Sequence, residues 1–142
     1  RMENLSLIKT ENPKENSRII YPNKSKLETY INILLKDILK DYNYTLYWSV
    51  RLNEYKRAPY DFGIYDNDNN DIIALIEIDG DQHYNRNNYL HKNDESFNNI
   101  SKKNEIAKSK DIPLYRIKEN SIRKENKNKI INDITFFIDN LN

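Results

Sequence analysis

Residues 60–84 read YDFGIYDNDNNDIIALIEIDGDQHY, and this stretch decides the fold. Two short runs within it are rich in aromatic and β-branched residues, which is typical of strands. The tract DNDNN between these runs has the composition of a turn. The stretch therefore predicts two neighbouring strands, Tyr60–Tyr65 and Ile72–Asp79.

The rest of the chain supplies helices and two more strands. Apolar residues at three- and four-residue spacing predict a helix from Ser25 to about Asp41, where Ser25 and Glu28 form a capping box. The other predicted elements are a strand Tyr44–Leu52, a helix Phe97–Lys110, a strand Ile112–Ile117 and a helix Lys127–Leu141. This order predicts an α/β fold, with a mixed sheet flanked by helices in one domain over residues 25–142. Residues 1–24 are polar and predict an irregular N-terminal arm.

The composition restricts the class of protein. Only 37% of the 142 residues are hydrophobic, but they cluster in periodic segments, which predicts one folded domain. The absence of cysteine excludes disulfide scaffolds and Cys-ligated zinc. No apolar run has transmembrane length and no signal-peptide pattern is present. We therefore expect a soluble, intracellular protein, in the cytoplasm or host nucleus, with no membrane partner.

Three acidic residues stand on or at the ends of the two central strands. Glu77 and Asp79 are two positions apart and point to the same face of one strand, while Asp61 begins the neighbouring strand. Like charges gathered in this way repel one another unless a cation compensates them. Since carboxylate oxygens select hard cations, we predict that Asp61, Glu77 and Asp79 bind Mg²⁺ or Mn²⁺. His83 follows the second strand, and its imidazole suits a general base or acid.

Each of these residues also has an ordinary structural explanation. Asp61 alone is compatible with a solvated strand end, and Asp79 before Gly80 with a turn. Glu77 is harder to explain, because burying a lone carboxylate within the apolar run ALIEI is costly. The acidic tract 66–71 lacks the glycine and the glutamate of an EF-hand loop, and two histidines are too few for a zinc site.

Four segments together resemble a known enzyme family. They are the helix that contains Glu28, then YDF, then IEIDGDQHY, and then KKNEIAKSKDIPLYRI. Over about Ser25–Ile117 the chain resembles the PD-(D/E)XK nuclease superfamily, in the branch near very-short-patch-repair (Vsr-like) and phage- or intron-associated endonucleases. The resemblance implies a restriction-endonuclease-like sheet and a Mg²⁺-dependent endonuclease that nicks or cleaves DNA, encoded by a virus or mobile element. RNA stays open as a substrate.

The resemblance also implies roles for individual residues. Asp61 matches the metal-binding Asp of the first motif strand, and Glu77 matches the acidic residue of the second. His83 matches a downstream His of this branch, and Glu28 matches an acid on the first helix that some members use. Asp79 stands where the superfamily frequently has a lysine, a departure that this branch shares.

The following helix departs further from the family pattern. Many relatives carry an Asp shortly before the KKNEIA segment, whereas residues 98–101 read NNIS. Asp94 and Glu95 would match that acid only with a shifted loop. Lys103 lies where some members carry a lysine on this helix, and it is a candidate to replace the motif lysine in catalysis. An exposed helical lysine without a catalytic role is the alternative explanation.

Basic residues predict a nucleic-acid-facing flank in the last third of the chain. Ten Lys and Arg residues follow Ser101 against six acidic ones, although the net charge of the whole chain is only +1. We expect a subset of them to contact DNA phosphates: Lys102, Lys103, Arg116 and Lys118. The alternative is an ordinary solvated surface. Because so small a domain has limited surface for a long site, we expect a homodimer or a partner module to supply specificity.

Two further functions stay open. The first is a nucleic-acid-binding member of the same fold without catalytic activity, which the missing helix acid favours. The second is a protein-interaction factor, which predicts no affinity for nucleic acid and tolerance of Glu77→Gln.

Overall fold

The computed structural model describes residues 7–8, 26–80 and 95–141, and these form one mixed sheet flanked by helices. The strands are β1 (Leu7–Ile8), β2 (Tyr44–Leu52), β3 (Tyr55–Asp66), β4 (Asp71–Asp79) and β5 (Leu114–Lys118). They lie in the order β1-β2-β3-β4-β5, so neighbours in the sequence are neighbours in the sheet. The pairs β1–β2, β2–β3 and β3–β4 are antiparallel, and β4–β5 is parallel.

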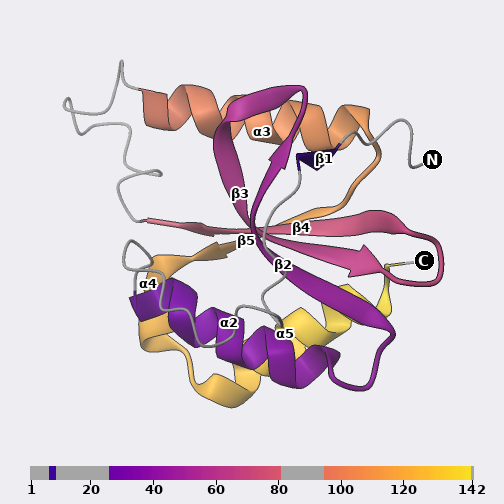
Figure 1. The fold of residues 1–142 in the computed structure, drawn as a ribbon. Helices are drawn as coiled ribbons and strands as arrows, with labels where there is room; N and C mark the ends of the chain where they lie inside the picture. The colour runs from indigo at the N-terminus through magenta and orange to yellow at the C-terminus, as the bar shows by residue number, and fades with distance from the viewer. Residues whose placement is uncertain (1–6, 9–25, 81–94, 142) are drawn as a thin grey trace.

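Helices cover both faces of the sheet (Figure 1). They are α2 (Lys26–Leu39), α3 (Glu95–Ser109), α4 (Glu119–Lys124) and α5 (Lys127–Asp139). Helix α3 covers one face, and α2, α4 and α5 cover the other. Helix α3 lies between the two parallel strands in the sequence, as a crossover connection requires. The predicted fold class, a single α/β domain with a mixed sheet between helices, is confirmed.

Each face of the sheet has its own hydrophobic core. The core beneath α2 and α5 is built from aliphatic and aromatic side chains that include Ile31, Leu35, Phe62, Ile76 and Ile134. The core beneath α3 includes Tyr60, Leu75, Ile106, Ala107 and Ile112. Because β4 contributes to both cores, it reads as a nearly continuous apolar run in the sequence. No helix in the described ranges is long and apolar enough to cross a membrane.

Three elements differ from the expectations drawn from the sequence. Strand β3 begins at Tyr55, five residues earlier than predicted, because pairing with β2 extends a segment whose lysine, arginine and proline are atypical of strands. Helix α4 was not predicted; its six residues place Ile122 in the core. In the arm expected to be irregular, Leu7–Ile8 pairs with Arg51 and Leu52 as an added edge strand.

The pairing of β3 with β4 ends at a defined point, which we call the β3–β4 fork. The last paired residues are Phe62 and Ile76, so Asp61 and Glu77 are the first residues beyond the ladder. Phe62 lies in the core beneath α2, whereas Tyr60 lies in the core beneath α3. On the neighbouring strand β2, Ser49 lies opposite this change of face, and its backbone φ of 57° is in the left-handed region. The fork thus brings Asp61 and Glu77 to the place where β3 changes its face.

Candidate functional site

Two hydrogen bonds link the strands of the β3–β4 fork where the ladder has ended. The backbone N–H of Asp61 donates to Oε1 of Glu77 at 3.3 Å. In the other direction, the N–H of Ile78 donates to Oδ2 of Asp61 at 2.8 Å. Each carboxyl group therefore accepts a hydrogen bond from a backbone N–H of the opposite strand. Leaving such an N–H group buried and unpaired would be costly. This exchange fixes both side chains within the fork.

Lys103 reaches the fork from α3. Its Nζ forms an ion pair with Oε2 of Glu77 and donates to the carbonyl oxygen of Pro59 at 2.7 Å. The side chains of Lys103 and Glu77 are only 11% and 6% exposed. Ile106 and Ala107 hold the same face of α3 against the sheet, and Lys103 lies one turn before them. Of the two explanations for Lys103, the structure thus excludes the exposed helical lysine.

The first turn of α2 adds a third carboxylate. The side chain of Glu28 hydrogen-bonds the carboxyl group of Asp61. The pKa of Asp61 is raised to about 7, first by burial and then by the negative charge of Glu77, while the bonds from the Ile78 N–H and with Glu28 oppose the increase. Asp61 therefore exchanges its proton near neutral pH, beside the ion pair of Glu77 with Lys103.

Asp79 belongs to a second ion pair beside the fork. Its Oδ1 accepts from Nη1 of Arg116 at 2.6 Å, and the Asp79 side chain is only 3% exposed. The same guanidinium group donates to Oδ1 of Asn104 at 2.9 Å and to the carbonyl oxygen of Ile100 at 3.3 Å. Arg116 on β5 therefore ties β4 to α3 and compensates the charge of Asp79 within the protein.

The structure brings some of the predicted site residues together. Glu28, Asp61, Glu77 and Lys103 meet at the fork, and Asp79 is engaged by Arg116. In the parts of the chain that the structure describes, no three His, Asp or Glu side chains are grouped so that they could hold one metal ion. His83 and Asp94 lie outside the described residues, as does the side chain of Glu95.

The four cations expected to contact DNA fall into two groups. Lys102 and Lys118 are exposed, as a phosphate-binding role requires. Lys103 and Arg116 are instead held in buried ion pairs, so they are not part of an exposed basic surface. They are buried because Lys103 on α3 and Arg116 on β5 both face the interface between that helix and the sheet. DNA contact by these residues stays a prediction.

Two residues of the site were not singled out from the sequence. Pro59 provides a carbonyl acceptor for Lys103, and the ring and hydroxyl of Tyr60 also contact that lysine. Both residues directly precede Asp61. Their position next to Asp61 in the chain was the available signal that they belong to the site. Nothing in the sequence indicated that α3 would pack against them.

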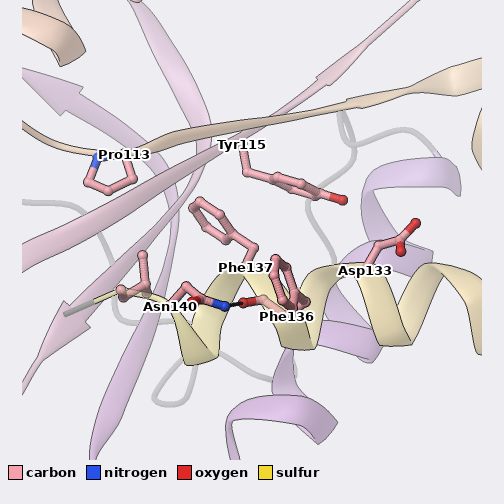
Figure 2. A pocket seen from close by; sticks show the side chains of 7 residues that line it. Pro113, Tyr115, Asp133, Phe136, Phe137 and Asn140 are labelled. Carbon is pink, nitrogen blue, oxygen red and sulfur yellow. Dashed lines mark hydrogen bonds between the residues drawn. The ribbon is translucent and has the colours of Figure 1, made fainter.

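A separate hollow lies between β5 and the second half of α5 (Figure 2). Its volume is about 420 Å³, and its walls are mainly apolar: Pro113, Tyr115, Phe136, Phe137 and Leu141. Figure 2 shows Tyr115 and Phe137 side by side, and their ring centroids are 4.8 Å apart. The one carboxylate in its lining, Asp133, accepts from Lys129 at 2.9 Å. The hollow contains no residue of the fork and offers no comparable cluster of reactive groups.

With this geometry established, the chain was compared with known proteins. No protein-family model, curated protein or solved structure matches it. The resemblance to PD-(D/E)XK nucleases therefore stays a prediction from the sequence motifs.

The buried ion pair at the fork predicts a large effect of removing its cation. Lys103→Met retains the aliphatic stem but leaves the buried Glu77 carboxylate without its ammonium partner. We expect the free energy of unfolding to fall by about 3 kcal/mol, measured by urea denaturation at neutral pH. The matched control is Lys102→Met, because the ion pair of Lys102 with Glu105, at 3.8 Å, is exposed. Its effect should stay below about 0.5 kcal/mol, and equal effects would contradict the assigned ion pair.

The raised pKa of Asp61 predicts how stability depends on pH. The pKa is about 7 in the folded protein, against an ordinary value of 3.8. The stabilisation from this proton is complete below about pH 4 and is lost as the pH rises through the folded pKa. The difference corresponds to at most about 4 kcal/mol in the free energy of unfolding. Asp61→Asn removes the titration but retains an oxygen for the Ile78 N–H.

The measurement is the unfolding free energy of both proteins between about pH 4 and pH 8.5, with divalent cations chelated. We expect Asp61→Asn to gain stability relative to the wild type as the pH rises through this window. A difference between the two proteins that does not change with pH would show that folding does not raise the pKa of Asp61.

Proposed function

We propose that this protein is a metal-dependent endonuclease that hydrolyses DNA phosphodiester bonds. The observation that carries the proposal is the β3–β4 fork itself, in which Asp61 and Glu77 are held together by backbone donors with the Lys103 ammonium beside Glu77. The sequence resemblance to PD-(D/E)XK nucleases supports the same activity. The proposal places the protein inside the cell, where DNA is its partner and a homodimer or partner module supplies specificity.

The fork offers a divalent cation two carboxyl groups beside one ammonium group. Asp61 and Glu77 supply the carboxyl groups, and Lys103 forms an ion pair with Glu77. The pKa of Asp61 is raised, first by burial and then by the negative charge of Glu77, and a bound cation would compensate the same charge. Mg²⁺ in proteins is usually held by one or two carboxylates and retains several waters, so Asp61 and Glu77 suffice as its protein ligands.

The chemistry of phosphodiester cleavage matches these groups. A divalent cation bound there would neutralise the attacked phosphate and lower the pKa of a bound water. Lys103 provides a fixed ammonium group next to Glu77, where it can stabilise negative charge that develops on the phosphate. The tie of Arg116 to Asp79, Asn104 and Ile100 keeps α3, and with it Lys103, in register with β4. His83 stays a predicted general base or acid.

A specific observation favours a second candidate, a DNA-binding protein of this fold without catalytic activity. Both oxygens of Glu77 already accept bonds within the protein, one from the Asp61 N–H and one from Lys103. Asp79 stands at the position of the family lysine, and its negative charge is compensated by Arg116. In the helix turn before Lys103, where many nuclease relatives carry an acid, Asn99 accepts a hydrogen bond from the Tyr55 hydroxyl. Its side chain thus contributes to packing. A polar cluster satisfied in this way can serve a structural role alone.

Cleavage of DNA distinguishes the two candidates. We expect purified protein to nick or cut supercoiled DNA with Mg²⁺ or Mn²⁺ and to be inactive with EDTA. Asp61→Asn and Glu77→Gln should each lower the rate by at least about 100-fold, because each removes a charged oxygen ligand. Asp37→Asn is the control, since Asp37 forms an exposed pair with Lys40 on α2.

Retention of DNA by wild type and both variants, without cleavage under any metal, would overturn the nuclease proposal in favour of the binding protein. Activity that survives both substitutions would show that the reaction occurs elsewhere on the chain. Circular dichroism of each variant confirms that the fold is retained.

Metal binding predicts a shift in melting temperature that does not depend on a substrate. Mn²⁺ at about 100 times its Kd stabilises the folded state by about 2.7 kcal/mol, which raises Tm by several degrees. We expect Asp61→Asn and Glu77→Gln to abolish this rise. Asp68→Asn tests the acidic turn after β3 as a competing site, because Asp68 accepts from Asn43 and an amide oxygen preserves that bond. A shift lost in Asp68→Asn but kept in the fork variants would assign the metal to the turn.

A further inference from the structure

Tyr60 contacts Lys103 at both ends of the lysine. The Tyr60 hydroxyl donates to the backbone carbonyl oxygen of Lys103 at 2.9 Å. The Lys103 Nζ lies 5.4 Å from the centroid of the Tyr60 ring, within the range of a cation–π interaction. Tyr60 is 0% exposed, so both contacts are shielded from water. One side chain therefore holds the helix backbone at Lys103 and also borders its ammonium group.

The position of Tyr60 in β3 explains why it can make both contacts. It lies between Pro59, whose carbonyl accepts from the Lys103 ammonium, and Asp61 of the fork. Pro59 and Tyr60 thus form a socket for the Lys103 ammonium group, with a hydrogen-bond acceptor and an aromatic face, directly before Asp61 in the chain. Burial raises the pKa of the Tyr60 phenol, so its hydroxyl stays a donor at physiological pH.

The socket restricts an otherwise flexible side chain. A lysine has four rotatable side-chain bonds, and the Glu77 ion pair alone does not fix the height of α3 above the sheet. The hydrogen bond from Tyr60 to the Lys103 carbonyl fixes the distance between α3 and the sheet at the residue that carries the ammonium group. Loss of the bond would let this turn of α3 move away from β3 and shift the ammonium relative to Glu77.

We propose that Tyr60 is a positioning residue that holds the Lys103 ammonium at Glu77 through its ring and its hydrogen bond to the helix backbone. Its consequence for cleavage rests on the proposed function, whereas its effect on Lys103 does not. Tyr60 touches neither the substrate nor the reacting atoms in this role. It acts only through Lys103.

The test is Tyr60→Phe, which retains the ring and removes the hydroxyl. We expect the NMR signals of the Lys103 Nζ and carbonyl carbon to shift, and the Nζ protons to exchange faster with water. Single-turnover cleavage should slow about tenfold with DNA affinity unchanged, as expected for a misplaced charge. In a Lys103→Met background the same substitution should cause no further loss, because residues that act as a unit are non-additive.

Tyr65→Phe is the matched control, since Tyr65 lies on the same strand and donates to Oδ1 of Asn70 at 3.3 Å. It should lower Tm less than Tyr60→Phe, because its hydrogen bond is exposed, and should leave the Lys103 signals and the cleavage rate unchanged. Lys103 signals that do not move in Tyr60→Phe would overturn the inference, as would full additivity with Lys103→Met.

The NMR readout separates this inference from the proposed function. If the wild type does not cleave DNA with any metal but Tyr60→Phe displaces Lys103, the nuclease proposal fails and the positioning role stands. Should Tyr60→Phe not fold, 3-fluorotyrosine at position 60 alters the hydroxyl donor within the same shape. Lys103 signals unaffected by fluorination would then contradict the inference.

Discussion

The exchange of hydrogen bonds across the β3–β4 fork, from Asp61 N–H to Glu77 and from Ile78 N–H to Asp61, is the interaction on which the other features depend. The strands separate there, and the carboxylates take over the role of the missing ladder by accepting backbone N–H groups. Two buried carboxylates side by side need a positive charge, which makes Lys103 necessary. Lys103 in turn requires α3 to pack closely on the sheet. The contacts that complete the fold are thus the same contacts that build the candidate site.

The two ion pairs beside each other differ in how completely they are compensated. Asp79 and Arg116 form a one-to-one pair, and two further N–H groups of Arg116 donate to Asn104 and to the carbonyl oxygen of Ile100. At the fork, by contrast, the carboxyl groups of Asp61 and Glu77 lie together and Lys103 pairs with Glu77, while burial and the negative charge of Glu77 raise the pKa of Asp61. Perturbed pKa values are more frequent at functional sites than elsewhere. This difference is the reason why the metal site is proposed at Asp61 and Glu77 and not at Asp79.

The sequence predicted most of the fold because its apolar periodicity is strong where the elements are long. The spacing of Leu27, Ile31 and Leu34 was enough for α2, and the alternation in IEID placed Glu77 and Asp79 on one strand. The burial of Lys103 could not be predicted, because α3 has few apolar residues and its register against the sheet is a tertiary property. The partnership of Arg116 with Asp79 likewise depends on the parallel pairing of β5 with β4, which local sequence does not encode.

The order of the strands has a consequence for how the protein folds. Strands β2, β3 and β4 are sequential antiparallel neighbours, so their contacts are local and can form early. The parallel pairing of β5 with β4 has to wait for the closure of a long loop that contains α3. Lys103 on α3 and Arg116 on β5 both belong to this part of the chain, which pairs with the sheet last. We therefore expect the carboxylates of the fork to come together before the cations that stabilise them, and folding to be faster when a counterion is present in solution.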